Sequence, residues 1–131
     1  MKKPSPEIEE YLELFVRFKE LNKKCRTVDI AKELEIAPAS VSEMFGKLEK
    51  KGFVKFKPYQ GVELTKKGEK TGKDILEKHR LMEQFLKLLG INEKNLHKEA
   101  CVLEHAISND VKNAIEKLIK NPEFQRIMKK N

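Results

Sequence analysis

The 131-residue sequence contains no tryptophan, only two cysteines and only three histidines. Two cysteines cannot build the disulfide framework of a small secreted domain, and Cys25, in the polar stretch "NKKCRT", is interpreted as core filler. No apolar run approaches the roughly 18 to 20 residues that span a bilayer, and the N-terminal "MKKPSPEIEEY" turns acidic where a secretory signal turns apolar. These absences exclude membrane-spanning and disulfide-rich classes and predict a cytoplasmic protein with one domain, or a small domain joined to a helical extension.

The charge of the chain is concentrated in one segment. Between Lys47 and Lys73, nine lysines accompany three acidic residues, which gives this segment a net charge of +6 out of the formal +7 of the whole chain. A local basic excess favours binding to a polyanion such as nucleic acid, although a solvated lysine-rich surface has the same composition.

Apolar spacing predicts a mainly α-helical chain with one small β hairpin. Three- and four-residue spacing predicts helices over 7–21, 27–36, 38–52, 65–90, 92–108 and 109–121, and alternation around "KPYQG" predicts a hairpin over 53–65. The order helix, helix, turn, helix, hairpin is that of a winged helix-turn-helix. We therefore expect a winged helix-turn-helix DNA-binding domain over 1–72, followed by a helical metal-binding and dimerisation domain over 73–131.

Several finer features follow from the same patterns. Thr27, Asn92 and Ser108 are the expected N-caps, and Gly52 and Gly90 the expected helix stops. Gly68 and Gly72 are expected to weaken the start of their helix, and the tail 122–131 to be frayed. The residues expected to face inward include Val28, Phe56, Val111 and Leu118.

The third helix and the hairpin carry the predicted contacts to DNA. If Val41, Phe45 and Leu48 face the core, the opposite side of this helix faces DNA. Its small residues suit contacts with base edges, and its lysines suit contacts with phosphates. Glu43 either accepts a hydrogen bond from a cytosine amino group or is kept away from the DNA. The predicted DNA-binding residues are Pro38, Ala39, Ser40, Ser42, Glu43, Lys47, Lys50, Lys55, Lys57, Tyr59 and Gln60. A winged helix used only for protein binding is the alternative.

The stretch "HKEACVLEH", residues 97–105, is unusually rich in groups that bind metals. On a helix His97, Cys101, Glu104 and His105 share one face, and on the preceding helix His79 and Glu83 lie four residues apart. Glu10 and Glu13 of the first helix lie off its apolar stripe, where they could reach toward Cys101. The eight residues together predict a metal site, whereas each alone is explained by core packing or surface charge.

Three other interpretations fit parts of the same pattern. An enzyme using Cys101 as nucleophile and His105 as base requires an orienting third group and an exposed cleft. A structural zinc site favours a closed set of four ligands with more cysteines. A winged helix controlled without metal, by a small ligand or by Cys101 oxidation, is the nearest alternative.

Four segments carry a more specific signal: "SPEIEEYLELF", "VDIAKELEIAPASVSEMFGKLEKKGFV", "GVELTKKGEKTGKDILEKHRLMEQFL" and "HKEACVLEH". Together they resemble the diphtheria toxin repressor and manganese transport regulator family of metal-dependent repressors over about residues 5 to 125. The resemblance implies a principal metal site of Glu10, Cys101, Glu104 and His105, with Glu13 and His79 shared or adjacent. It also implies a second site of His79, Glu83 and His97, as in the iron-type branch.

The chain combines features of both branches of this family. Iron-type members carry a thioether where this chain has Glu10, and manganese-type members carry a carboxylate where it has Cys101. The chain also shows no counterpart of the C-terminal SH3-like domain that lends ligands to the second site in many iron-type members, so the occupation of that site is left open. A thiolate beside imidazoles and carboxylates suits Fe(II), which we expect to be slightly preferred over Mn(II).

The expected function is repression of transcription with the metal as corepressor. Without metal, Glu10 and Glu13 repel Glu104, and a bound divalent ion converts that repulsion into a tether between the first helix and the dimerisation domain. A homodimer is expected through Phe85, Leu86, Leu89, Leu103 and Ile107. Its two recognition helices would bind a palindromic operator in double-stranded DNA at half-sites roughly 34 Å apart. No small-molecule substrate is expected.

Overall fold

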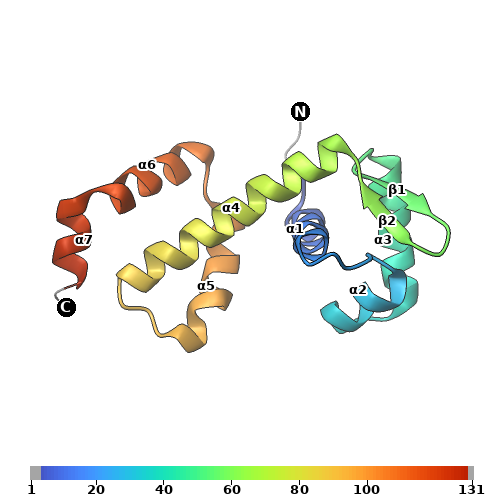
Figure 1. The fold of residues 1–131 in the computed structure, drawn as a ribbon, viewed down its shortest axis with the longest axis horizontal. Coiled ribbons are helices and arrows are strands. Elements are labelled where there is room, and N and C mark those ends of the chain that lie inside the picture. The colour runs from blue at the N-terminus through green and yellow to red at the C-terminus, as the bar shows by residue number, and fades with distance from the viewer. Residues whose placement is uncertain (1–3, 130–131) are drawn as a thin grey trace. The chain divides into compact units, whose positions relative to one another are not determined.

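The computed structural model describes residues 4–129, and the predictions that touch residues 1–3 and 130–131 lie outside this range. Within it the chain is mainly helical with one two-stranded antiparallel sheet, as predicted (Figure 1). The chain divides inside its longest helix into two compact units, one up to Asp74 and one from Ile75 onward. Among the described residues, no helix has both the length and the hydropathy needed to cross a membrane.

The first unit is the winged helix-turn-helix. Its elements are α1 (Pro6–Glu20), α2 (Thr27–Leu34), α3 (Pro38–Lys50), β1 (Val54–Lys57), β2 (Gly61–Leu64) and the beginning of α4 (Lys66–Leu88). The two strands pair from Val54 opposite Leu64 to Lys57 opposite Gly61. This order confirms the fold class read from the sequence.

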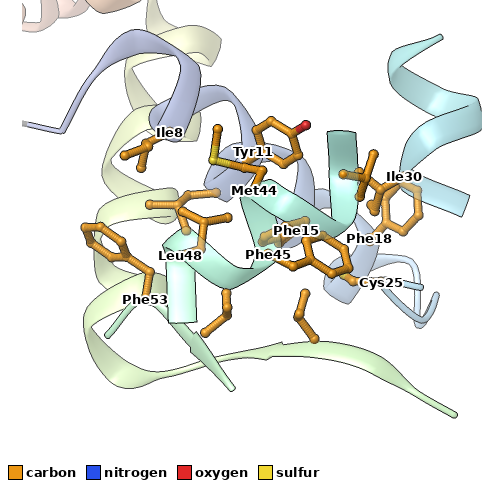
Figure 2. Close-up of a cluster of buried hydrophobic side chains, with 14 of the residues drawn as sticks. Ile8, Tyr11, Phe15, Phe18, Cys25, Ile30, Met44, Phe45, Leu48 and Phe53 are labelled. Carbon is orange, nitrogen blue, oxygen red and sulfur yellow. The ribbon is translucent and has the colours of Figure 1, made fainter. Parts of the chain in front are cut away.

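The core of this unit is formed by one face of α1 and one face of α3, together with side chains of α2 and of the hairpin (Figure 2). Phe15 of α1 meets Phe45 of α3 edge-on, with the ring centroids 5.7 Å apart. Cys25 is part of this core, which confirms its interpretation as filler. Its carbonyl accepts a 3.1 Å hydrogen bond from the amide of Val62, so the loop before α2 is fixed to the hairpin. Burial, with a smaller contribution from Asp29, raises the pKa of the Cys25 thiol to about 11.

The start of α2 differs from the prediction. Arg26, not Thr27, is the N-cap, because the helix already begins at Thr27. The Arg26 side chain makes no capping hydrogen bond and pairs with Asp29 at 2.9 Å. The prediction for Val28 is also wrong, because its side chain is 61% exposed. Two residues along a helix turn the side chain to nearly the opposite side, so Val28 cannot share the buried face of Ile30.

The beginning of α4 is firmly packed, contrary to the expectation from its glycines. The hydroxyl of Thr65 caps the helix by accepting a 3.1 Å hydrogen bond from the amide of Gly68, and it donates to the carbonyl of Gly52 at 2.6 Å. A Cβ on Gly72 would lie 2.6 Å from Val16 Cγ2 and 2.7 Å from the Leu12 carbonyl oxygen. The absence of a side chain at Gly72 therefore permits the close approach of α4 to α1.

The second unit contains the rest of α4 together with α5 (Glu93–Ala106), α6 (Asn109–Lys120) and α7 (Pro122–Lys129). Its core is formed by Leu81, Met82, Leu86, Ala100 and Ile119. The predicted caps Asn92 and Ser108 are confirmed, because their side chains accept from the amides of Lys94 at 3.0 Å and Val111 at 3.2 Å.

Two predictions for this unit are wrong. The tail is not frayed over 122–129: it forms α7, whose first amides, those of Glu123 and Phe124, donate to the side chain of Asn121 at 2.8 Å and 3.2 Å. Val111 and Leu118 are exposed rather than inward, and Ile119 is the buried residue of α6. The buried face of α6 is therefore rotated by one residue from the predicted face.

Candidate metal centre

Helices α4 and α5 bring six predicted ligands together within the second unit. They are His79, Glu83, His97, Cys101, Glu104 and His105. His79 lies at the middle: its Nε2 is 3.1 Å from His97 Nδ1, and its Nδ1 is 3.7 Å from Cys101 Sγ. Its Nε2 also contacts the carboxylate of Glu83, one helical turn further along α4.

The same geometry divides the donors into two overlapping groups. His79, His97 and Cys101 place one nitrogen or sulfur atom each within 4.8 Å of one another, and Cys101 Sγ is 3.6 Å from His97 Nε2. On the other side of His79, the Oε1 atom of Glu104 lies 3.3 Å from His79 Nδ1 and 3.5 Å from His105 Nε2. The four- and three-residue spacings along α5 produce this convergence.

Glu104 is the residue whose surroundings most clearly indicate a bound cation. Its side chain is only 1% exposed, and the His79 side chain beside it is fully buried. Within the described residues, no donor makes a hydrogen bond of ordinary geometry to either carboxylate oxygen, so the two imidazole contacts are close but poorly directed. Burial of a carboxylate is costly unless the charge is compensated. A divalent ion among nitrogen, sulfur and oxygen donors would compensate it, so the residues present fit a transition metal.

The two remaining predicted ligands belong to α1 of the first unit. Glu10 is exposed there, whereas Glu13 is buried and accepts a 2.9 Å hydrogen bond from Arg17. Glu9 of the same helix is buried as well. A shared site between these acids and the α5 residues stays a prediction.

One buried charged residue beside the cluster was not anticipated. Lys78 precedes His79 on α4, is 6% exposed, and donates to the carbonyl of Ile107 at 3.5 Å. A lysine in a helix rich in lysine gives no sequence signal of burial. Its contact with the end of α5 helps to position α4 and α5, the helices that carry the six donors.

The predicted DNA-binding residues lie on the surface of the first unit. In α3 the side chains of Val41, Met44, Phe45 and Leu48 are buried. The exposed residues of that helix include Pro38, Ala39, Ser40, Ser42, Glu43, Lys47 and Lys50, and those of the hairpin include Lys55, Lys57, Tyr59 and Gln60. Lys57 pairs with Glu63 at 2.6 Å, a contact that lowers the pKa of the Glu63 carboxyl. Phe56, which was predicted to face inward, is 54% exposed instead.

Comparison with known proteins identifies both parts of the chain. Residues 3–62 match the iron dependent repressor N-terminal DNA binding domain, and residues 65–128 match the iron dependent repressor metal binding and dimerisation domain. An HTH-type transcriptional regulator of Methanocaldococcus jannaschii is 43% identical over 109 residues, which are 82% of this chain and 87% of that protein. The HTH-type transcriptional regulator MntR of Shouchella clausii is 37% identical over 116 residues, 88% of this chain and 81% of that protein.

The fold is also shared with solved structures. The structure of the manganese regulator SloR aligns with a TM-score of 0.77 and 32% identity over 92% of this chain, which corresponds to 56% of the SloR chain. The chain thus spans little more than half the length of that protein. The resemblance read from the sequence is confirmed, and the enzyme interpretation is excluded: this chain belongs to the iron-dependent repressor family of metal-dependent DNA-binding transcriptional repressors, which includes MntR.

Proposed function

We propose that this protein is a cytoplasmic transcriptional repressor whose corepressor is a divalent transition metal, with Fe(II) slightly preferred over Mn(II). The observation that carries the proposal is the buried Glu104 carboxylate, which has no well-formed hydrogen bond among the described residues and lies beside His79. Such a group destabilises the protein until a cation reaches it.

The ligands follow from the family and from the cluster. Cys101, Glu104 and His105 would hold the principal ion together with Glu10, and Glu13 and His79 would lie beside it. His79, Glu83 and His97 would hold a second ion. The contact between His79 and Cys101 at 3.7 Å supports coupling of the two groups, because one side chain borders both.

The regulatory step uses the charges of three carboxylates. Glu10 and Glu13 of α1 and Glu104 of α5 repel one another while all are ionised. The bound ion supplies the positive charge that removes this repulsion. With the repulsion removed, α1 is held to α5, and the DNA-binding part of the chain is restricted to the arrangement that binds DNA.

The choice of metal depends on Cys101. Its sulfur and the imidazoles around it favour Fe(II) over the harder Mn(II), whereas SloR, to which the chain is similar, is a manganese regulator. Affinity alone rises toward copper and zinc, so metal supply in the cell also contributes to selection.

The operator and the dimer complete the proposal. Residues 1–72 would bind double-stranded DNA through α3 and the hairpin, and residues 73–131 would form the homodimer that reads a palindromic operator. Of the predicted dimer residues, Leu89 is exposed and Phe85, Leu103 and Ile107 are half-buried, whereas Leu86 is buried within the protomer. The exposed Val111 and Leu118 of α6 add apolar surface that a partner copy could cover.

Anaerobic titration of DNA binding with Fe(II), Mn(II) and Zn(II) tests the proposal. We expect no tight binding in EDTA, tight binding with metal, and loss of the metal response in Glu104→Ala and His105→Ala. Cys101→Ala and Glu10→Ala are expected to weaken the response more than Glu83→Ala. DNA affinity that is indifferent to metal, but changes when Cys101 is oxidised, would favour the metal-free alternative.

A further inference from the structure

The hairpin displays two aromatic rings to solvent. Among the described residues, Phe56 at 54% and Tyr59 at 95% are the aromatic side chains that are exposed. The aromatic residues of the first unit other than these two are Tyr11, Phe15, Phe18, Phe45 and Phe53, and all of them are buried. Exposed large apolar groups that gather in one place mark an interaction surface more often than single scattered ones do.

Tyr59 is held in a conformation that its side chain disfavours. The turn is closed by a hydrogen bond of 3.1 Å from the amide of Gln60 to the carbonyl of Lys57, and Tyr59 has a φ of 64°. After a proline such as Pro58, glycine or asparagine is the usual residue with positive φ. A tyrosine at this place is costly to the fold, and such strain is typical of positions kept for function.

Phe56 lies on the same face of the hairpin as the buried Val54 and Val62, yet its own ring is 54% exposed. It pairs with Val62, and Val54, two residues earlier on the same face, is only 1% exposed. The side chains on this face of β1 therefore change from buried at Val54 to exposed at Phe56. Lys55 and Lys57 precede and follow Phe56 and therefore lie on the opposite face of the strand, where Lys57 pairs with Glu63; both lysines are exposed.

We propose that Phe56 and Tyr59 enter the minor groove of duplex DNA beside the segment read by α3, and pack against sugars and base edges there. The net charge of +6 over residues 47–73, which include the hairpin, favours a polyanion over an apolar protein partner. Apolar side chains in a minor groove gain contacts that depend on groove width, so the rings make affinity depend on the base pairs that flank the half-site. This inference rests on the proposed DNA binding and differs from the phosphate contacts predicted for the hairpin.

The test uses the full chain with Mn(II) and a duplex that it selects from a random-sequence pool. Tyr59→Gly is the central variant, because glycine relieves the strained φ and removes the ring. We expect a melting temperature equal to or above that of the wild type, and a DNA affinity lower by about tenfold. Tyr59→Phe removes only the hydroxyl and should leave DNA binding unchanged. Phe56→Leu removes the aromatic ring but keeps an apolar side chain, and it should weaken DNA binding.

The salt dependence distinguishes the rings from the lysines. Tyr59→Gly should leave the slope of log affinity against log salt unchanged, whereas Lys55→Ala should reduce it by roughly 0.9 for each lost phosphate contact. Replacing A·T by G·C pairs in the flanks should weaken the wild type more than Tyr59→Gly.

Two outcomes overturn the inference while the proposed function stands. They are wild-type affinity in Tyr59→Gly, and a reduced salt slope in that variant, which would make Tyr59 a phosphate contact. If the wild type selects no duplex in the presence of metal, the proposed function fails first, and the inference fails with it.

Discussion

Sγ of Cys101 lies 3.7 Å from Nδ1 of His79, and this contact joins α5 to α4 at the middle of the donor cluster. Because His79 also contacts His97 and Glu104, it borders both groups of donors. A change at His79 should therefore affect metal binding more broadly than a change at the edge of the cluster.

The first prediction compares His79→Ala with His97→Ala. We expect His79→Ala to lower Co(II) affinity on the order of 10- to 100-fold, and His97→Ala to lower it less. Optical titration with Co(II) also reports a sulfur-to-metal absorption, which should persist in His97→Ala and disappear in Cys101→Ala. Lys98→Ala, at an exposed neighbour of His97, is the control. Equal losses of Co(II) affinity in His79→Ala and His97→Ala would contradict the position of His79 between the two groups of donors.

The second prediction concerns the energetic cost of Glu104. Glu104→Met replaces a buried carboxylate by an apolar group of similar length, so the protein in EDTA should become more stable by about 1 to 3 kcal/mol. The same variant should lose the rise in melting temperature that metal gives to the wild type.

Glu99→Met is the matched control, because Glu99 is exposed on the same helix. It should change neither quantity appreciably. A Glu104→Met protein that is less stable than the wild type in EDTA would show that the carboxylate is satisfied without a cation.

The third prediction separates the two thiols. With a pKa of about 11, the buried Cys25 is ionised in about one molecule in a thousand at pH 8, so iodoacetamide should modify Cys101 in the native protein and leave Cys25 intact. Metal should slow the modification of Cys101, because a coordinated sulfur is no longer free to react. Peptide mass spectrometry after timed quenching gives both rates, and urea should expose Cys25.

Stability should follow the same pKa shift. The thiol ionises near 9.0 in the unfolded chain and near 11 in the folded one, so its contribution is complete below about pH 9 and is lost as the pH rises toward 11. Cys25→Ala should remove this part of the alkaline loss. Native labelling of both thiols at the same rate, or an unchanged alkaline profile in Cys25→Ala, would contradict the burial of Cys25.

The order of elements and the ligand cluster could be predicted because both depend on local spacing. Helical periodicity places Cys101 one turn after His97 wherever α5 packs, and the caps Asn92 and Ser108 have short-range causes. The fold class and the convergence of six donors were therefore accessible from the sequence.

The features that were missed depend on how far each core extends. Periodicity gives the side of the strand on which Phe56 lies, but only the packed structure shows that its ring stays exposed and that α6 buries Ile119 rather than Val111 or Leu118. The burial of Glu9 and Lys78 likewise has no signal in a chain so rich in charge. The helix α7 was missed, although proline is a favoured residue in a first helical turn.

The last prediction uses two glycines that lie inside helices. An added Cβ at Gly72 would meet Val16 Cγ2 at 2.6 Å and the Leu12 carbonyl oxygen at 2.7 Å, so α4 must move away from α1. Gly72→Ala should destabilise the protein by about 1 to 3 kcal/mol. Gly46 in α3 is the matched control, because an added Cβ there meets nothing within 4 Å among the described residues. Gly46→Ala should stabilise the protein by about 0.5 to 1 kcal/mol through helix propensity alone.

Urea unfolding of the two variants in EDTA measures both effects, and the opposite signs make the comparison decisive. Helix propensity is the same for both substitutions, so the difference between them reports the packing of α4 on α1 alone. If Gly72→Ala is as stabilising as Gly46→Ala, then α4 can shift at little cost, and the glycines at its start are weak points of the helix as the sequence first suggested. A difference of several kcal/mol shows instead that residue 72 must be glycine for α4 to pack against Leu12 and Val16.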